Sequence, residues 1–395
     1  MRFGITILTD LPWAEARPRW QAVEEMGFDH AWTYDHLVWG GLPESPWTTA
    51  TPVLGAAAQV TSRIGLGTLV ASPNFRHPYL LFRDAQALED LSDGRFLLGV
   101  GTGGNLDATL LDLPELSVRE RVDRFQEFTE TLVALRDGDH VSRQGRWFST
   151  SDARTLPPLR RTPLLVAANG PRSLRFAARV GDGWVTTGPS TETVEEWWTG
   201  LATAAATYDE ALDATGRGPT PRYLLTDSPD RFALSSRGFF EEVAGRAAEL
   251  GFTDLVTHWP RPDAPYAGDV AVLEEVAADV LPAWRSRPPT GLPPAPCPRW
   301  AAPCSPPVSR SPRSAPAAVV GATSTRRCSA RAWSRRSPSW VSDCSPAPSS
   351  ASPVGSGRSP RGRWRSAPWP PAWWSRWASV TTCSPAPRPP TWPAR

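Results

Sequence analysis

The chain has 395 residues and carries 42 basic and 40 acidic side chains, so its formal net charge is only +2. This average conceals two unlike parts: residues 1–285 hold 26 basic and 39 acidic residues, a net charge of −13, whereas residues 286–395 hold 16 arginines and one carboxylate, Asp343. No window of the sequence reaches the roughly 18 apolar residues of a membrane helix, which excludes an integral membrane protein of the helical type.

Short apolar runs alternate with longer amphipathic segments throughout residues 1–285. This alternation is typical of parallel strands joined by helices. The eight expected strands span residues 3–9, 30–35, 63–70, 95–101, 163–168, 183–187, 221–226 and 254–258. The helices that follow them are expected near residues 12–26, 50–61, 78–91, 118–136, 171–180, 191–214, 236–250 and 269–284.

The ends of several expected helices carry their own signals. Ser117 and Glu120 have the spacing of a capping box. Glycines that can adopt the left-handed conformation follow four helical segments and are expected to end them, namely Gly27, Gly94, Gly181 and Gly251.

Eight strand and helix pairs in about 280 residues predict a single TIM (β/α)8 barrel. An α/β doubly wound open sheet is the alternative. Such a sheet would normally carry a glycine-rich dinucleotide turn after its first strand, whereas Thr9, Asp10, Leu11 and Pro12 stand there. In a barrel, the catalytic groups lie at the carboxyl ends of the strands, which directs attention to four loops.

The second of these strands ends in Asp35 and His36. A lone histidine beside an aspartate is more often a structural hydrogen-bonding group, but at this position in a barrel it suits proton transfer near neutral pH. The third strand leads to Ser72, which either contacts a ligand or forms an ordinary Ser-Pro turn. The glycine-rich stretch 99–104 lacks the Lys-Ser/Thr pair of a phosphate-binding P-loop.

Asn169, Gly170, Arg172 and Ser173 open a helix directly after the fifth strand. Free backbone amides, a hydroxyl and a guanidinium would converge there, and a phosphate is the natural ligand of such a site. An ordinary helix cap with an exposed arginine is the alternative. Near other strand ends, an aromatic group could line a substrate pocket: Trp13, Trp39, Trp47, His258 and Trp259.

Several of these segments together resemble the luciferase-like flavin or deazaflavin oxidoreductases, especially the branch that uses coenzyme F420. The segments are TYDHL (33–37), GTLVASPNFRHP (67–78), LSDGRFLLGVGTG (91–103) and AANGPRSLRFAARVGDGW (167–184). The resemblance covers residues 1–285 and none of the remainder. It implies F420 as the cofactor, with FMN as the alternative.

The resemblance also implies roles for individual residues. His36 would be the catalytic proton donor or electrostatic partner, and the bond between Leu69 and Val70 would be a non-proline cis peptide that supports the coenzyme ring. The positions expected to bind the cofactor are Asp35, Val70, Ser72, Thr102, Asp107, Asn169, Gly170, Arg172 and Ser173. In the branch that oxidises glucose 6-phosphate, a glutamate stands at the position of Gly104; its absence, and that of any lysine, argues against that substrate.

We therefore expect an F420-dependent oxidoreductase that transfers a hydride between the deazaflavin and a small organic substrate. An FMN-dependent luciferase-like monooxygenase is the first alternative, and a non-catalytic flavin-binding barrel is the second. We expect a cytoplasmic homodimer with no nucleic-acid or membrane partner and no metal site.

Residues 286–395 differ in kind from the barrel. They contain 24 of the 44 prolines, all five cysteines and few aliphatic side chains, so we expect a disordered extension rich in Arg, Pro, Ser and Trp. A frameshift or read-through product is the preferred hypothesis for its origin, and a nucleic-acid-binding tail is the functional alternative. The cysteines lack the spacing of a zinc site.

Overall fold

The computed structural model describes residues 1–159, 162–227 and 231–286. The extension expected to be disordered, residues 286–395, lies outside the described residues apart from Ser286. The last described helix ends at Arg285, where the barrel was expected to end.

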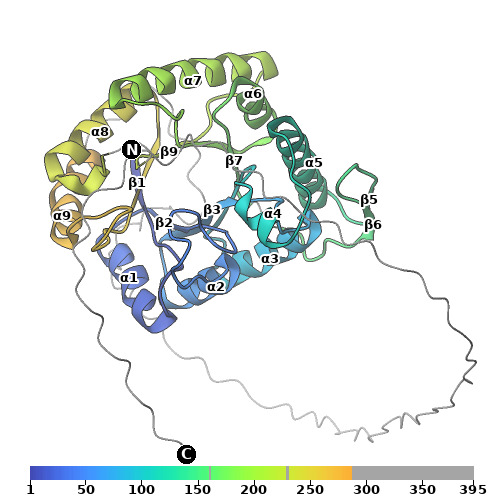
Figure 1. Ribbon diagram of the computed structural model, residues 1–395, viewed down its shortest axis with the longest axis horizontal. Coiled ribbons are helices and arrows are strands. Elements are labelled where there is room, and N and C mark those ends of the chain that lie inside the picture. The colour runs from blue at the N-terminus through green and yellow to red at the C-terminus, as the bar shows by residue number, and fades with distance from the viewer. Residues whose placement is uncertain (160–161, 228–230, 287–395) are drawn as a thin grey trace, which may run out of the picture. The chain divides into compact units, whose positions relative to one another are not determined.

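Eight parallel strands form a closed barrel in the order β1-β10-β9-β8-β7-β4-β3-β2, and helices surround it (Figure 1). All eight expected strands are present, so the predicted TIM barrel is confirmed. The strands are β1 (Arg2–Thr6), β2 (His30–Thr33), β3 (Gly65–Ala71), β4 (Phe96–Val100), β7 (Leu164–Ala167), β8 (Gly183–Thr186), β9 (Arg222–Leu225) and β10 (Asp254–His258).

The helices of the outer layer also lie where the sequence predicts them. They are α1 (Trp13–Glu25), α2 (Ala50–Val60), α3 (Pro78–Leu91), α5 (Val118–Asp137), α6 (Pro171–Val180), α7 (Val194–Thr215) and α8 (Arg237–Glu249). The last expected helix is built of α9 (Val270–Glu275), a π-helical turn η2 (Val276–Val280) and α10 (Leu281–Arg285). Ser117 and Glu120 form the predicted capping box at the start of α5.

Three features were not predicted. They are the short helix α4 (Leu106–Leu110), the hairpin of β5 (Val141–Arg143) and β6 (Thr150–Ala153), and the 3-10 turn η1 (Ala233–Ser235). Figure 1 shows the hairpin beside α5, outside the ring of strands.

One helix ending differs from the prediction. Gly27, Gly94 and Gly251 have the expected positive φ angles of 86°, 77° and 77°. The prediction for Gly181 was wrong, because its φ of −79° and ψ of 148° are extended. The chain passes straight from α6 towards β8, and the N–H of Asp182 already donates to the carbonyl of Leu164 on β7 at 2.7 Å.

The base of the barrel interior is closed by a buried ion pair. Asp254 lies 2.9 Å from Nε2 of His30 and accepts a hydrogen bond of 2.9 Å from Arg2. Trp32 donates to Nδ1 of His30 at 2.7 Å, so the proton of His30 is on Nε2 and points to Asp254. Burial would raise the pKa of Asp254, but the charge of Arg2 and the hydrogen bond from His30 outweigh it and lower that pKa to about 2.

Candidate functional site

His36 follows β2 and is held by a carboxylate from another part of the chain. Its Nδ1 lies 2.7 Å from Oδ2 of Asp107, whose Oδ1 accepts the N–H of Leu37 at 2.7 Å. Asp107 is on the first turn of the unpredicted helix α4 and is buried. The His36 side chain is 21% exposed, and its Nε2 has no partner among the described residues. The site therefore offers one oriented imidazole nitrogen for proton transfer or charge stabilisation.

Asp35, expected to contact a cofactor ring, is buried and forms an ion pair with Arg76. Its two oxygens accept hydrogen bonds from Arg76 at 2.6 and 2.8 Å, and Arg76 also donates to Asp84 on α3 at 2.8 Å. Burial would lower the pKa of Arg76, but the hydrogen bond and charge of Asp35, together with Asp84, raise it. Asp35 therefore fixes the loop after β3 against the end of β2.

The end of β3 carries the predicted irregularity. The peptide bond between Leu69 and Val70 is cis, and the pairing of β3 with β4 shifts register between Thr68 and Ala71. A Cβ atom on Gly101 would lie only 2.5 Å from Cγ2 of Val70, so only a glycine fits at position 101 beside this side chain. The glycines after β4 thus allow a close approach of the backbone.

Ser72 lies under the glycine-rich turn that follows β4. Gly103 has a φ of 65°, and a Cβ atom there would lie 2.7 Å from Oγ of Ser72. Thr102 precedes it and is partly exposed. A Cβ atom on the next residue, Gly104, would meet nothing within 4 Å, so there is open space beside the backbone at this position.

Arg124 is a residue of this region that the sequence analysis missed. It lies on α5, is 8% exposed, and donates to the side-chain oxygen of Asn74, whose amide donates to the carbonyl of Gly104. Arg124 has no carboxylate partner in the described part of the chain, and its Nε is buried without a hydrogen bond. Burial and then the charge of Arg121 lower the pKa of Arg124. A buried cation without a counter-ion is suited to an anionic ligand.

The sequence did contain a signal for Arg124. It precedes Phe128 and Leu132 by four and eight residues, which places all three on one face of a helix. Because that face is apolar and buried, an arginine in this series indicates a charge taken into the interior.

Two side chains of the predicted phosphate site, those of Asn169 and Arg172, already form hydrogen bonds within the protein. The side chain of Asn169 joins β7 to β8 by donating to Thr187 at 3.0 Å and accepting from Thr186 at 2.7 Å. Arg172 is half-exposed and donates to Asp123 and Gln126 on α5.

What remains open at that site is the start of α6. No side chain caps the first turn after Gly170, and a Cβ atom on Gly170 would meet nothing within 4 Å. Ser173 lies in this turn and is partly buried. The backbone amides of the turn are therefore free to bind an anion.

Part of the expected aromatic group comes together at the mouth of the barrel. Trp39 and Trp47 lie 6.3 Å apart between ring centroids, and both pack on the interior cluster that contains Tyr34. His258 stacks on Tyr266 at 3.6 Å. Trp13 and Trp259 do not join them, since they pack on the separate cluster between strands and helices.

Tyr34 and Tyr266 were not singled out in the sequence. Burial raises the pKa of Tyr34, and Tyr266 and Asp227 add to this effect. Burial likewise raises the pKa of Tyr266 to about 12, although the hydrogen bond with Tyr34 acts in the opposite direction. Both phenols therefore remain protonated at neutral pH.

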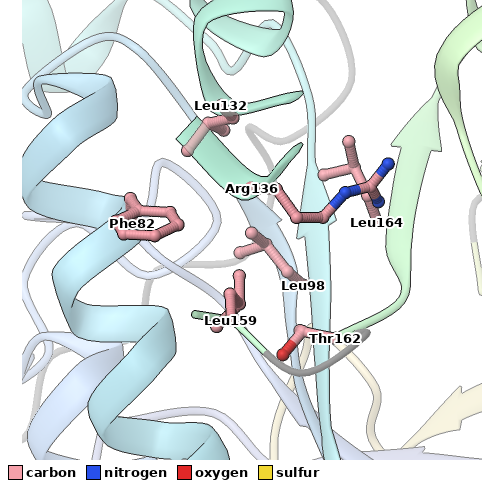
Figure 2. Close-up of a pocket in the computed structure, with 7 residues that line it drawn as sticks. All are labelled: Phe82, Leu98, Leu132, Arg136, Leu159, Thr162 and Leu164. Atoms are coloured by element: carbon pink, nitrogen blue, oxygen red, sulfur yellow. The ribbon is translucent and has the colours of Figure 1, made fainter. Parts of the chain in front are cut away.

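A small cavity of about 10 Å³ lies in the barrel wall, away from these groups (Figure 2). Phe82, Leu98 and Leu132 are among its lining residues, which come from α3, β4 and α5. Its volume is that of about one water molecule, so it is a packing defect and not a substrate site.

Within the described ranges, none of the helices has both the length and the apolar character required to cross a membrane.

Comparison with known proteins identifies the family. The chain is 32% identical over 326 aligned residues to the F420-dependent glucose-6-phosphate dehydrogenase of Beutenbergia cavernae, covering 67% of this chain and 91% of that protein. It is also 32% identical over 271 residues to the F420-dependent hydroxymycolic acid dehydrogenase of Mycobacterium tuberculosis, covering 66% of this chain and 69% of that protein.

The fold agrees with solved structures. An F420-dependent secondary alcohol dehydrogenase in complex with an F420-acetone adduct superimposes with a TM-score of 0.62 at 18% identity, over 71% of this chain and 98% of that one. A family model described as luciferase-like monooxygenase matches residues 1–277, which is almost the whole barrel. The chain therefore belongs to the luciferase-like monooxygenase family of oxidoreductases.

Proposed function

We propose that this protein is an F420-dependent dehydrogenase that transfers a hydride between the deazaflavin and the carbon of an alcohol or carbonyl group. The observation that carries the proposal is the pair of His36 and Asp107, which presents one free imidazole nitrogen at the strand ends of a barrel whose sequence relatives are F420-dependent dehydrogenases.

The chemistry of the site fits the coenzyme in two respects. A phosphate needs cationic and N–H donors, and the site offers the unpaired Arg124 together with the uncapped first turn of α6. A flat ring system needs open space beside the backbone, and Gly104 supports this, because a Cβ atom there would meet nothing within 4 Å, while Gly101 and Gly103 let the backbone after β4 pack directly on Val70 and Ser72.

When bound, the deazaflavin supplies the hydride chemistry, and the barrel supplies binding, orientation and electrostatics. His36 holds a proton or a positive charge at Nε2, while Asp107 keeps Nδ1 engaged and the ring oriented. Val70, Ser72 and Thr102 form the surface on which the ring would rest. Asp35 acts through Arg76, by keeping the loop after β3 in place.

The phosphate would bind to the backbone of Gly170 and Ser173 and to Arg124, with Asn169 and Arg172 holding the start of α6 against β8 and α5. We propose a hydroxyl-bearing organic molecule without a phosphate as the substrate class. Gly104 in place of an acidic group, and the absence of lysine from the sequence, support this choice.

Titration of the full-length protein with F420 and with FMN, followed by coenzyme fluorescence, tests the cofactor. We expect saturable binding of F420 and weaker binding of FMN. Reduction of F420 is then measured with a panel containing 2-propanol, longer secondary alcohols and glucose 6-phosphate. Tight FMN binding without any response to F420 would contradict the proposal and favour the monooxygenase alternative.

Replacing Arg124 by glutamine is expected to weaken coenzyme binding by roughly 10- to 100-fold, because a charged hydrogen bond to a phosphate contributes about 1.5–3 kcal/mol. Arg172→Ala is the matched comparison, since Arg172 already pairs with Asp123 and is half-exposed. We expect a smaller loss there, measured by the same fluorescence titration. Equal dissociation constants for wild type and Arg124→Gln would refute the assignment of Arg124.

A further inference from the structure

A third histidine and aspartate pair lies at the carboxyl ends of the barrel strands, and the proposed function does not use it. His258 ends β10, and its Nδ1 lies 2.8 Å from Oδ2 of Asp227, which follows β9. Nε2 of His258 lies 2.7 Å from the hydroxyl of Tyr34, which follows β2. All three side chains come from strand ends on the side of the barrel where His36 lies.

The direction of these hydrogen bonds is fixed by Asp227. Its carboxylate also accepts the backbone N–H of His258 at 2.8 Å and the hydroxyl of Thr257 at 2.8 Å. Because Asp227 is an acceptor, Nδ1 of His258 carries the proton and Nε2 accepts the hydroxyl proton of Tyr34. An aspartate that orients a histidine, which in turn accepts from a hydroxyl, is the arrangement of an activated hydroxyl group.

Tyr266 extends this chain towards the mouth of the barrel. Its hydroxyl lies 3.4 Å from that of Tyr34, and its ring stacks on His258 with an interplanar angle of 6°. Tyr266 has a φ of 67°, a conformation that tyrosine rarely adopts and that functional sites retain more often than other parts of a structure. The Tyr34 ring also contacts the ring of His36 edge to face, with 6.1 Å between the ring centroids. This hydrogen-bonded chain of side chains therefore lies next to the proposed coenzyme site.

The pair of His30 and Asp254 at the base of the barrel differs from that of His258 and Asp227 in its ionic partners. There, Asp254 has Arg2 as a permanent counter-ion in addition to His30. In the described part of the chain, the only ionic partner of Asp227 is His258. The charge of Asp227 is therefore available to stabilise a positive charge that forms on His258, whereas that of Asp254 is already neutralised.

We propose that the hydroxyls of Tyr34 and Tyr266, supported by His258 and Asp227, take the hydroxyl proton of an alcohol substrate as its hydride leaves. This inference rests on the proposed function and names the proton acceptor on the substrate side. The substrate C–H pair passes as hydride to the deazaflavin, and the substrate O–H proton passes to Tyr266. The Tyr266 proton passes to Tyr34, and the Tyr34 proton passes to Nε2 of His258.

This step balances. The products are a carbonyl compound, the coenzyme that has gained the hydride, and an imidazolium ion opposite the carboxylate of Asp227. No tyrosinate accumulates, which agrees with two buried phenols that hold their protons firmly. In the reverse direction, the same chain returns the proton to the oxygen of a ketone.

Tyr34→Phe, Tyr266→Phe and Asp227→Asn test the proposal in the full-length protein with F420 and the best alcohol of the panel. We expect kcat to fall on the order of 100-fold for Tyr34→Phe, with the dissociation constant of F420 unchanged, because a general base in the right position contributes about that factor or more. The wild-type kcat is expected to fall in D2O, and this solvent isotope effect should change in Tyr34→Phe.

Tyr223→Phe is the matched control. Tyr223 is also buried inside the barrel and hydrogen-bonded, to Arg2 at 3.3 Å, but it lies at the base. We expect its kcat and its response to D2O to equal those of the wild type, even if its melting temperature falls. If Tyr34→Phe keeps the wild-type kcat and isotope effect, the relay is refuted while the dehydrogenase function stands.

A measurement without turnover separates the two proposals. The 15N resonances of His258 are followed while trifluoroethanol, an alcohol that resists oxidation, is added to the F420-loaded protein. We expect Nε2 of His258 to shift in the wild type and not in Tyr34→Phe, while no shift in the wild type would refute the relay. If this shift occurs but no alcohol in the panel reduces F420, the proposed dehydrogenase function fails and the hydroxyl-binding chain remains.

Discussion

Replacing His36 by alanine is expected to lower the turnover of the F420-loaded enzyme by on the order of 1000-fold, because the group that we propose to stabilise the charge developing during hydride transfer is lost. The coenzyme should bind nearly as well as before, because the phosphate contacts we propose lie on α5 and α6. Steady-state kinetics with the best alcohol, together with the fluorescence titration, separates the two quantities. A variant that loses coenzyme affinity but keeps kcat would contradict the role of His36.

Two further variants sharpen this result. Asp107→Asn should retain the hydrogen bond from Leu37 but lose the charge beside His36, so we expect kcat to fall less than in His36→Ala. His140→Ala is the control, because Nδ1 of His140 also pairs with a carboxylate, that of Asp152, at 2.6 Å, but on the β5–β6 hairpin. We expect His140→Ala to leave kcat unchanged.

Replacing Asp254 by alanine is expected to destabilise the barrel by about 3–5 kcal/mol, because a partly buried arginine and a buried histidine then lose their partner. Glu195→Ala is the control. It breaks the exposed pair with Arg246, and exposed pairs contribute about 0–1 kcal/mol. Urea denaturation at pH 7 measures both free energies of unfolding. Equal values would mean that Asp254 contributes no more than a surface ion pair.

The same residue predicts an acid dependence of stability. The pKa of Asp254 in the folded protein is about 2, below the ordinary value of 3.8. A carboxyl group with a lowered pKa stabilises the fold in its charged form, so its contribution is complete above about pH 5 and decreases as the pH falls through 4 towards 2. Denaturation midpoints of wild type and Asp254→Ala should therefore converge in this range. A constant difference between them down to pH 2 would contradict the assignment.

The regular part of the fold could be predicted because local patterns determine it. Short apolar runs located every strand of the barrel, amphipathic segments located its main helices, and the capping box at Ser117 marked the start of α5. The helix α4 was not predicted because it has only five residues, and Asn105 at its N-cap makes no side-chain capping hydrogen bond. The prediction for Gly181 was wrong because the chain there follows the pairing of Asp182 with Leu164 on β7, a contact between residues distant in sequence.

The candidate site was predictable in its positions and not in its pairings. The rule for barrels placed His36, Ser72 and Asn169 at strand ends, but it could not show that Asp107 reaches His36 over 71 positions of sequence. Nor could it show that both carboxylate oxygens of Asp35 accept hydrogen bonds from Arg76. The expected homodimer and the cofactor contacts of individual residues stay predictions.

The alternation of side chains along β2 and the three residues after it links the stability of the protein to its proposed chemistry. His30, Trp32, Tyr34 and His36 follow one another at every second position, and they belong in turn to the buried ion pair, the interior packing, the proposed proton chain and the proposed coenzyme site. A one-residue insertion before His30 would turn all four out of the barrel together, whereas an insertion in the β5–β6 hairpin would displace none of them. Length changes during the divergence of related chains should therefore accumulate in the hairpin and be absent from β2.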